Sequence, residues 1–408
     1  MGRRIIIINT TLLAILAGVA LFAQPPRPGP ALLMDGHVHL IDRVYWEGID
    51  PWKAQPIGDF DFARAREGGL NVVFENLAPY GYEDYNQTVK QLGRFVETFH
   101  RVLEKNRDKM ELALTSADVR RIVASGKTAV LLGVEAGFDQ DGDIDILRLW
   151  YRLGIRSIQF SSHWATSYAD AAFPGAEHWN GINERGRQLI AEMNRLGMLI
   201  DITHSTEPAM RQIVEASRAP VVASHSGLRA LTGQGGIPDD IVQALVAKGG
   251  LIGINSTAGT ISPRYAEWAR SHPARGVAGI TLGDAIQPHN LPLVRPQKPD
   301  FGEYSQAYDA EMRKRWRQLW SQPWQEDPEG RALLPTVDDY ADYIARAVKI
   351  AGPTHIAIGM DLFTGRSHFR DFDARDYHQI AEALQKRNVP VGVLGENWLR
   401  VLEAAKVP

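Results

Sequence analysis

The sequence contains no cysteine. This absence excludes disulfide bonds, thiolate metal sites, a cysteine nucleophile and a lipoprotein anchor on cysteine. The chain also has no long basic run, and the formal net charge of its 408 residues is -3, which argues against nucleic acid as a partner. Of the residues that commonly bind transition metals, only histidine and the carboxylates remain. Any such site in this chain therefore has to be built from histidine, aspartate and glutamate.

An apolar run follows two arginines at the N-terminus, at residues 5–23, and small residues lie near its end. This pattern is typical of a secretory signal peptide, which we expect at residues 1–23. An N-terminal membrane anchor is the alternative, because the run is just long enough to span a bilayer. Leu21 would also be a poor residue at the third position before a cleavage site. In either case we expect an exported protein, periplasmic or otherwise extracytoplasmic, and membrane-anchored under the second interpretation.

The segment after this run is rich in proline and predicts an extended linker at residues 24–30. The remainder, residues 31–408, is expected to be the folded body. The chain as a whole is 44% hydrophobic and 23% charged, which is ordinary for a globular protein.

Short apolar runs rich in valine and isoleucine alternate in this body with longer helical patterns. Most are apolar throughout, as parallel strands buried on both faces are. Eight strand–helix units predict an α/β fold, a (β/α)8 TIM barrel. A doubly wound open sheet is the alternative, but no glycine-rich dinucleotide loop follows the first strand. The predicted strands lie at residues 32–35, 71–74, 128–134, 155–160, 198–202, 220–223, 250–254 and 355–358.

A long insertion follows the seventh predicted strand, at about residues 256–335. It is too long to be a single loop in a compact barrel. It is dense in tryptophan, arginine, tyrosine and proline, and a helix is expected near residues 303–319. One interpretation is an excursion on the outer surface or a contact in an oligomer, such as a homodimer. The other, which we favour, is a lid over the mouth of the barrel.

The first predicted strand ends in Asp35-Gly36-His37-Val38-His39-Leu40. On a strand, residues i and i+2 point to the same face, so His37 and His39 can act together. Two imidazoles on one face form a chelate that suits zinc and similar ions. Since a His-x-His pair also occurs by chance, this motif alone does not decide between a metal site and two ordinary histidines.

Polar residues also follow five other predicted strands at the point where each apolar run stops. In a (β/α)8 barrel the carboxyl ends of all strands meet at one mouth, where the chemistry takes place. We therefore expect these side chains to converge with His37 and His39 on a metal site. They are Glu135 after the third strand, His163 after the fourth, His204 after the fifth, His225 after the sixth and Asp361 after the eighth.

Longer motifs make the chain similar to the membrane (renal) dipeptidase family, peptidase family M19, within the amidohydrolase superfamily. The most specific is the run GINERGRQLIAEMNRLGMLIDITH at residues 181–204. Ser224-His225-Ser226, IPDD at residues 237–240 and GENWLR at residues 395–400 add to it. The resemblance extends over about residues 34–401. It implies a metal-dependent hydrolase that cleaves a small amide, most often a dipeptide, outside the cytoplasm.

The resemblance also implies a role for each candidate residue in a centre of two divalent ions, usually zinc. Such a centre supplies hydroxide near neutral pH from a water whose pKa falls to about 7. One residue would move the proton of this water to the leaving amine, and another would stabilise the developing oxyanion. By resemblance, His37 and His39 bind one ion, Glu135 bridges, His204 and His225 bind the second, Asp361 moves the proton and His163 contacts the scissile carbonyl.

Three positions depart from the family pattern. The family has His-x-Asp where this chain has His37-Val38-His39, which removes one negative charge from the ligand set, although the wider superfamily uses His-x-His. The family's arginine for the substrate carboxylate is missing from residues 233–236, and Arg229 or an insertion residue such as Arg264 is the candidate replacement. A structural salt bridge is the alternative for Arg229. The motif that begins with Asp361 reads DLFTG instead of DFDG.

These departures leave two further hypotheses beside a dipeptidase. The first is an enzyme that acts on another exported amide, ester or lactone, because the carboxylate-binding arginine is missing. The second is a non-catalytic binding protein that uses the long insertion as its contact surface, because the ligand set has changed. Bound transition metal would argue against the second.

Overall fold

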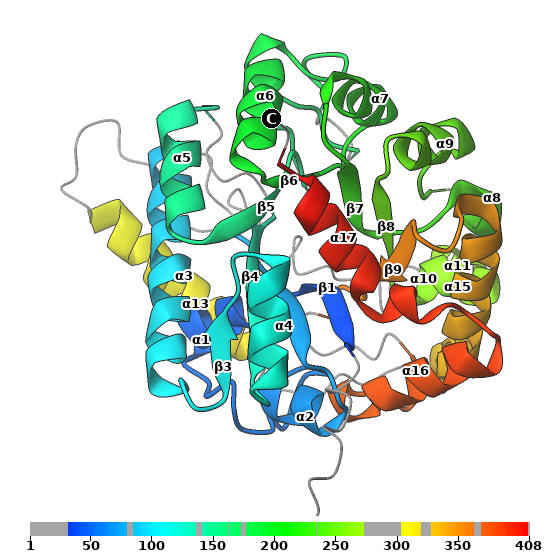
Figure 1. The fold of residues 1–408 in the computed structure, drawn as a ribbon. Coiled ribbons are helices and arrows are strands. Elements are labelled where there is room, and N and C mark those ends of the chain that lie inside the picture. The colour runs from blue at the N-terminus through cyan, green and yellow to red at the C-terminus, as the bar shows by residue number, and fades with distance from the viewer. Residues whose placement is uncertain are drawn as a thin grey trace, which may run out of the picture. The chain divides into compact units, whose positions relative to one another are not determined.

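Eight parallel strands form a nearly closed barrel surrounded by helices (Figure 1). The computed structural model describes residues 32–79, 85–135, 141–162, 164–172, 177–233, 235–272, 303–319, 328–362 and 369–406. The predicted signal or anchor segment and the proline-rich linker lie outside these residues. Among the helices in the described part of the chain, none is both long and apolar enough to cross a membrane. The predicted (β/α)8 barrel is confirmed.

Each strand of the barrel pairs in parallel with its neighbours, in the order β1-β2-β4-β5-β6-β7-β8-β9. Among the described residues, one bridge closes the ring between β9 and β1, and it pairs Val38 with Leu362. The backbone N–H of His39 donates to the Leu362 carbonyl at 3.1 Å, and that of Asp361 donates to the His37 carbonyl at 3.0 Å. The strands are β1 Met34–Val38, β2 Val72–Leu77, β4 Thr128–Val134, β5 Ile155–Gln159, β6 Leu199–Asp201, β7 Val221–Ser226, β8 Leu251–Ile254 and β9 Ile356–Ile358.

All eight predicted strands are present, with two differences. A ninth strand, β3 (Met110–Leu112), pairs with β4 away from the barrel path and was not predicted. Its three residues are too few to give a periodic signal. The first strand, predicted at residues 32–35, continues to Val38. His37 therefore lies on the strand and not beyond it.

Helices cover the outside of the barrel, and their ends follow local capping chemistry. The Asn183 side chain accepts from the Gly186 N–H and begins α6, and Gly197 ends it at φ 80°. Helix α9 begins directly after Pro238, and its first turn carries two aspartates. The outer helices are α1 Ile41–Glu47, α2 Phe62–Glu67, α3 Tyr85–Lys105, α4 Ser116–Ala124, α5 Ile144–Arg152, α6 Glu184–Leu196, α7 Glu207–Ala216, α8 Arg229–Thr232, α9 Asp239–Ala247, α15 Val337–Ala351 and α16 Tyr377–Lys386.

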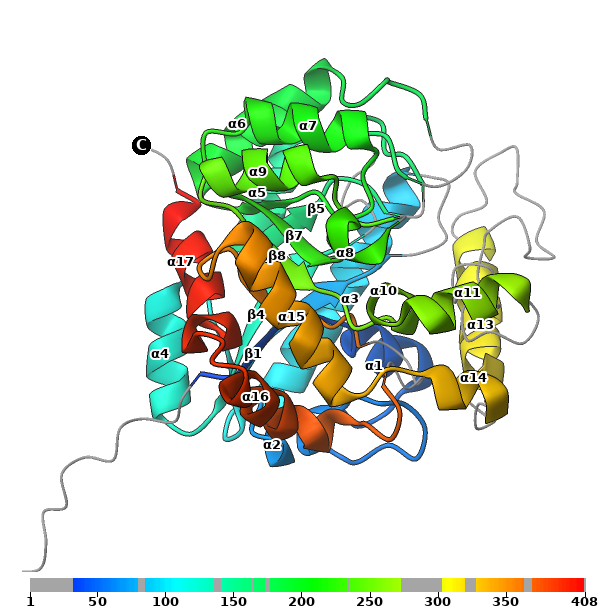
Figure 2. The same cartoon turned by 90° about the vertical axis from the view of Figure 1, so that its right-hand side faces the viewer.

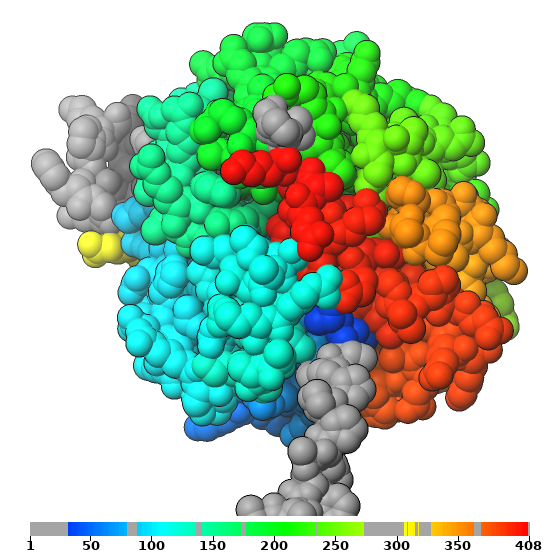
Figure 3. Space-filling view, in the orientation of Figure 1, coloured from blue at the N-terminus to red at the C-terminus, as the bar shows by residue number. Residues whose placement is uncertain are grey.

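The final helix, α17 (Glu396–Ala404), closes the end of the barrel at which the strands begin. Trp398 of this helix is buried in one apolar cluster with Met34, Leu199 and Leu251, which open their strands. Its indole N–H donates to the Ile358 carbonyl at 2.9 Å. In the space-filling view, the C-terminal segment lies at the centre of this face (Figure 3). The chemistry is thus restricted to the opposite end.

In the described part of the long insertion, four helices lie between β8 and α15: α10 Ala258–Ile261, α11 Pro263–Ser271, α13 Glu303–Leu319 and α14 Pro328–Leu333. The helix predicted at residues 303–319 is confirmed with the same bounds. In Figure 2 these helices lie together beside α1. The Arg313 guanidinium of α13 lies 4.4 Å from the centre of the Tyr45 ring of α1. Residues 273–302 and 320–327 lie outside the described part of the chain, so the lid stays a prediction.

Candidate metal centre

The alternation of side chains along the strands points Glu135 and Asp361 into the barrel. Ala129 and Leu131 of β4 belong to the apolar cluster around Trp398, whereas Val130 and Leu132 pack against the outer helices. Glu135 continues the first series, two positions beyond Gly133, and is 2% exposed. Asp361 continues the equivalent series from Ala357 of β9. Both carboxylates therefore lie at the open end.

An irregularity in β1 lets both histidines of the opening motif reach the same point. The register of β1 against β2 shifts between Asp35 and Val38. Within the shifted segment, Gly36 faces Trp398 so closely that a Cβ there would lie 2.0 Å from the indole ring. One Asp35 carboxylate oxygen accepts from the His37 and Met360 N–H groups, both at 3.0 Å, and holds the shifted backbone against β9. Such bulges often re-aim side chains beside active sites.

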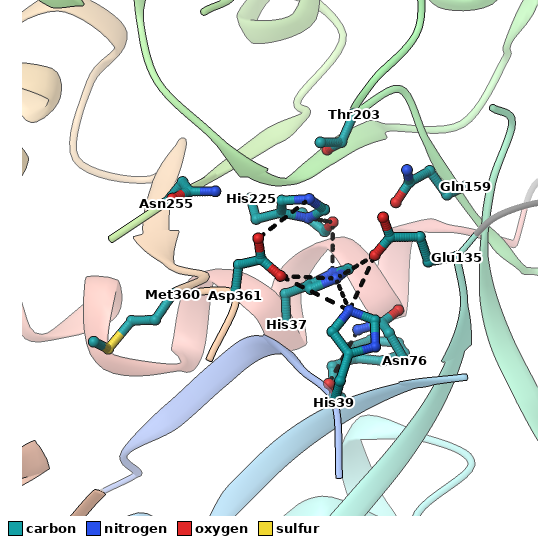
Figure 4. A network of polar contacts seen from close by, with 12 residues as sticks. His37, His39, Asn76, Glu135, Gln159, Thr203, His225, Asn255, Met360 and Asp361 are labelled. Atoms are coloured by element: carbon teal, nitrogen blue, oxygen red, sulfur yellow. Dashed lines mark hydrogen bonds and ion pairs between the residues drawn. The ribbon is translucent and has the colours of Figure 1, made fainter. Parts of the chain in front are cut away.

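Three overlapping groups of possible ligands lie here, and His37, His39 and Glu135 form the first (Figure 4). The third, made of His37, His225 and Asp361, takes one histidine from each of the other two. In the first group, the Nε2 atoms of His37 and His39 lie 3.0 Å apart. Each approaches the Oε2 atom of Glu135, at 2.9 Å from His37 and 3.0 Å from His39. All three residues of the first group are buried.

His204, His225 and the same glutamate form the second group. The Nε2 atoms of the histidines lie 3.1 Å apart. His204 Nε2 lies 3.4 Å from Oε1 of Glu135, which is the oxygen that the first group does not approach. Glu135 thus offers one oxygen to each group. Asp361 lies beside both, with Oδ1 3.8 Å from Nε2 of His37 and Oδ2 4.0 Å from Nε2 of His225.

The two groups fit a pair of divalent ions of the zinc type. The donors are imidazole nitrogens and carboxylate oxygens, which zinc accepts. Ligand atoms around a tetrahedral zinc with bonds of about 2.0–2.1 Å lie about 3.3 Å apart, close to the separations of 2.9–3.4 Å found here. A carboxylate with one oxygen in each group is the arrangement that a bridged pair requires.

Two serine hydroxyls support the ligand set from behind. Ser224 Oγ lies 2.9 Å from Nδ1 of His37 and 2.8 Å from Nδ1 of His225. A metal on Nε2 leaves the ring proton on Nδ1, and one hydroxyl oxygen has lone pairs for two such donors. Ser224 therefore favours the ligand tautomer in both groups at once. The Ser162 hydroxyl donates to Oε1 of Glu135 at 3.0 Å.

Burial and mutual charge set the protonation of the cluster. Burial raises the pKa of Glu135, but hydrogen bonds from His204, His37 and His39 outweigh it and lower that pKa well below its usual value. Burial, with the charge of His37, lowers the pKa of His225 well below its usual value. Glu135 is therefore ionised and His225 neutral near pH 7, which is the state that a ligand needs.

Asp361 differs from Glu135 in both environment and backbone. Burial raises its pKa above the usual value for aspartate, as expected of a group that exchanges protons near neutral pH. Asp361 and His204 adopt left-handed backbone angles, with φ of 62° and 65°. Non-glycine residues rarely take this conformation, and strain of this kind concentrates at functional sites.

The structure brings together six of the predicted site residues: His37, His39, Glu135, His204, His225 and Asp361. Their roles stay predictions. His163 lies outside the described residues. Arg229, at the start of α8, pairs with Glu207 at 2.7 Å and donates to the Gly236 carbonyl at 3.3 Å.

Sequence reasoning gave no role to Ser162, Ser224 or Asp42. The two serines stand beside His163 and His225 in the strand-end motifs, and that adjacency was the available signal. Asp42 lies three residues after His39, and its side chain approaches that imidazole. This contact depends on where α1 begins, which the sequence pattern did not define.

The chain is similar to known proteins of one family along most of its length. The family model described as membrane dipeptidase (peptidase family M19) matches residues 31–407. Dipeptidase tcpJ of Claviceps purpurea is 32% identical over 237 residues, which are 54% of this chain and 56% of that protein. The chain thus spans little more than half the length of this relative.

Solved structures share the fold at lower identity. The probable dipeptidase PvdM from Pseudomonas aeruginosa superposes with a TM-score of 0.68 at 21% identity, over 92% of this chain and 96% of that one. A metallopeptidase from Rhodobacter sphaeroides, liganded with a phosphinate mimic of the dipeptide L-Ala-D-Ala, superposes with a TM-score of 0.64 at 17% identity. It covers 92% of this chain and 99% of that one.

Proposed function

The chain belongs to the membrane dipeptidase family, peptidase family M19, and from this premise we propose that it is an exported, metal-dependent hydrolase of dipeptides. One observation carries the proposal. Glu135 offers one carboxylate oxygen to each of two histidine pairs, and the Asp361 carboxylate lies within about 4 Å of a histidine of each pair. This is the arrangement that metal-assisted hydrolysis of an amide needs.

In this proposal His37 and His39 would hold one zinc ion, His204 and His225 would hold the other, and Glu135 would offer one carboxylate oxygen to each. When bound, the ions supply Lewis acidity and a water acidic enough to be hydroxide near neutral pH. Glu135 offsets part of the added positive charge and sets the separation of the two groups. Ser224 keeps the two rings it contacts in the ligand tautomer.

Asp361 is the proposed general base and acid. Its side chain is 28% exposed, so it can meet a substrate from the open end of the barrel. Its raised pKa suits a carboxylate that accepts the proton of the attacking water and returns it to the leaving amine. His163 is the proposed group that stabilises the developing oxyanion of the scissile carbonyl.

A second candidate function keeps the metal centre but changes the substrate. Arg229, the candidate for binding a free substrate carboxylate, is paired with Glu207, which neutralises the charge that it would offer. This pairing favours an amide, ester or lactone without a free carboxylate. Better turnover of C-terminally amidated dipeptides than of free ones would select this candidate.

The test is turnover of a dipeptide panel, including D-residue C-termini, by zinc-loaded protein. We expect hydrolysis by the native chain and a loss of about 10²- to 10⁴-fold in kcat in Asp361→Asn, because a positioned proton-transfer group contributes that much. Zinc content should be retained in this variant. Asp145→Asn, an exposed carboxylate on α5, is the matched control and should keep full activity. Absence of turnover on every dipeptide at full zinc occupancy would contradict the substrate assignment.

Export is proposed on the pattern at residues 1–23 alone. The mass of the N-terminal peptide of the full chain, expressed in a bacterium and fractionated, distinguishes the alternatives. A peptide beginning after residue 23 in the soluble extracytoplasmic fraction supports a cleaved signal. An intact N-terminus in the membrane fraction supports an anchor. Intact protein in the cytoplasm would contradict export.

A further inference from the structure

Position 39 is where this chain departs from its family, since histidine replaces the expected aspartate. We propose that Asp42 compensates for this change: its carboxylate lies behind the His39 imidazole, orients that ring as a ligand and supplies the missing negative charge. The inference rests on the proposed metal-dependent function and deepens it.

The two side chains face each other away from the metal-binding edge. Oδ2 of Asp42 lies 3.7 Å from Nδ1 of His39, while Nε2 of the same ring lies 3.0 Å from Glu135. The ring is therefore held between a carboxylate at each nitrogen. The separation of 3.7 Å is longer than a hydrogen bond but within the range of a charge contact.

The local fold fixes Asp42 in this place. The Glu75 carboxylate of β2 accepts from the backbone N–H groups of Leu40 and Ile41, both at 2.7 Å. This contact holds the turn from β1 into α1, so that Asp42 enters the first turn of the helix three residues after His39. Its Oδ1 accepts from the Ala78 N–H at 3.4 Å.

Burial of Asp42 argues that the carboxylate has a specific purpose. The residue is 0% exposed, and a buried charge is costly unless it is paired. Within the described residues, His39 is the one basic side chain within 4.0 Å of it. Burying an apolar side chain at this position would cost less free energy than burying a carboxylate. We therefore infer that the charge acts on His39.

Two of the other three ligand histidines, His37 and His225, differ from His39 in the group behind the ring. His37 and His225 share the neutral Ser224 hydroxyl at Nδ1, whereas His39 faces a carboxylate. A carboxylate behind a ligating histidine raises its basicity and fixes its orientation, and loss of such a partner lowers metal affinity by about 10- to 100-fold. The extra negative charge thus lies at the one ring that replaces a carboxylate.

The test is zinc affinity, measured by chelator competition with zinc alone, on the native chain, Asp42→Asn, His39→Asp and the double variant. We expect Asp42→Asn to weaken one of the two zinc ions by about 10- to 100-fold in the native background. In the His39→Asp background, where the family pattern is restored, Asp42→Asn should lower the zinc affinity by less than about threefold. Urea unfolding of the metal-free variants reports whether each folds.

The outcomes separate this inference from the proposed function. If the native chain binds no zinc, the proposed function fails. If it binds two ions and Asp42→Asn loses no affinity, or loses equally in both backgrounds, the compensating role is wrong. Should Asp42→Asn not fold, Asp42→Glu retains the charge and is measured instead. Affinity within about threefold of the native value supports the role, and a loss above tenfold contradicts it.

Discussion

The hydroxyl of Ser224 contacts a histidine of each proposed metal group, so one small residue supports both. We predict that Ser224→Ala lowers the affinity of both zinc ions, by about 10- to 100-fold, because two rings lose the partner that fixes their tautomer. Chelator competition measures this loss. Ser217→Ala is the matched control, since that buried serine bonds to Asn194 and the Ala219 carbonyl. Unchanged affinity in Ser224→Ala would refute the role.

For single residues, the sequence predicted which proposed ligands lie together, but not the side chains behind them that hold them in position. Glu135 and Asp361 could be found because each follows an apolar run, and strand ends of a barrel converge. The geometry of His37 and His39 could not be predicted from the sequence, because it depends on the register shift in β1. Asp42 was missed for a similar reason, since its contact depends on the turn that Glu75 holds.

Helices α5 and α6 are joined by one carboxylate. Glu192 of α6 accepts from Arg195 on its own helix and from Arg148 on α5, at 2.8 and 2.7 Å. The hydrogen bond from Arg195, opposed by burial and aided by Arg148, lowers the pKa of Glu192 to about 2. Since the folded pKa lies below the unfolded one, the ionised glutamate stabilises the fold above about pH 4.5, and this stabilisation falls as the pH falls toward 2.

We therefore predict that Glu192→Gln lowers the free energy of unfolding at pH 7 by about 1–2 kcal/mol, a value reduced from the full shift because the arginines are exposed to solvent. The difference between native and variant chains should shrink by about half at pH 3. Urea unfolding at several pH values measures it. A difference that is the same at pH 7 and pH 3 would show that charge is not the cause.

Element boundaries were predicted less well than element types. The first strand was placed at residues 32–35 because its apolar run stops there, yet the ladder continues to Val38. Polar residues are tolerated on this part of the strand because they point into the open, polar end of the barrel. β3 was missed because three residues carry no periodicity. Longer elements give stronger signals: helix α6 has thirteen residues with an apolar stripe and a capping residue at each end.

Trp398 packs against the first residues of several strands at the closed end of the barrel. We predict that Trp398→Ala lowers the free energy of unfolding by about 3–5 kcal/mol, since it leaves a cavity among the first residues of several strands. It also removes the donor to the Ile358 carbonyl. Thermal and urea unfolding measure the effect. Trp179→Ala is the control, because Trp179 is 42% exposed. It should lower the free energy of unfolding much less than Trp398→Ala does. Equal losses in the two variants would contradict the account.

The architecture of the molecule could be predicted because eight buried strands alternating with helices allow few arrangements. The packing of the insertion against the barrel could not be predicted. Contacts such as Arg94 of α3 with Asp309 of α13 join residues far apart in the sequence, and no local pattern identifies such pairs.

The central claim is that Glu135 joins two metal groups at the open end of this barrel. Metal analysis of the purified full chain after zinc loading and removal of free zinc tests it most directly. The account predicts two zinc ions per chain, and at most one in Glu135→Gln, where the bridging charge is lost. A native chain that retains no zinc, or a Glu135→Gln variant that retains as much as the native chain, would contradict the claim.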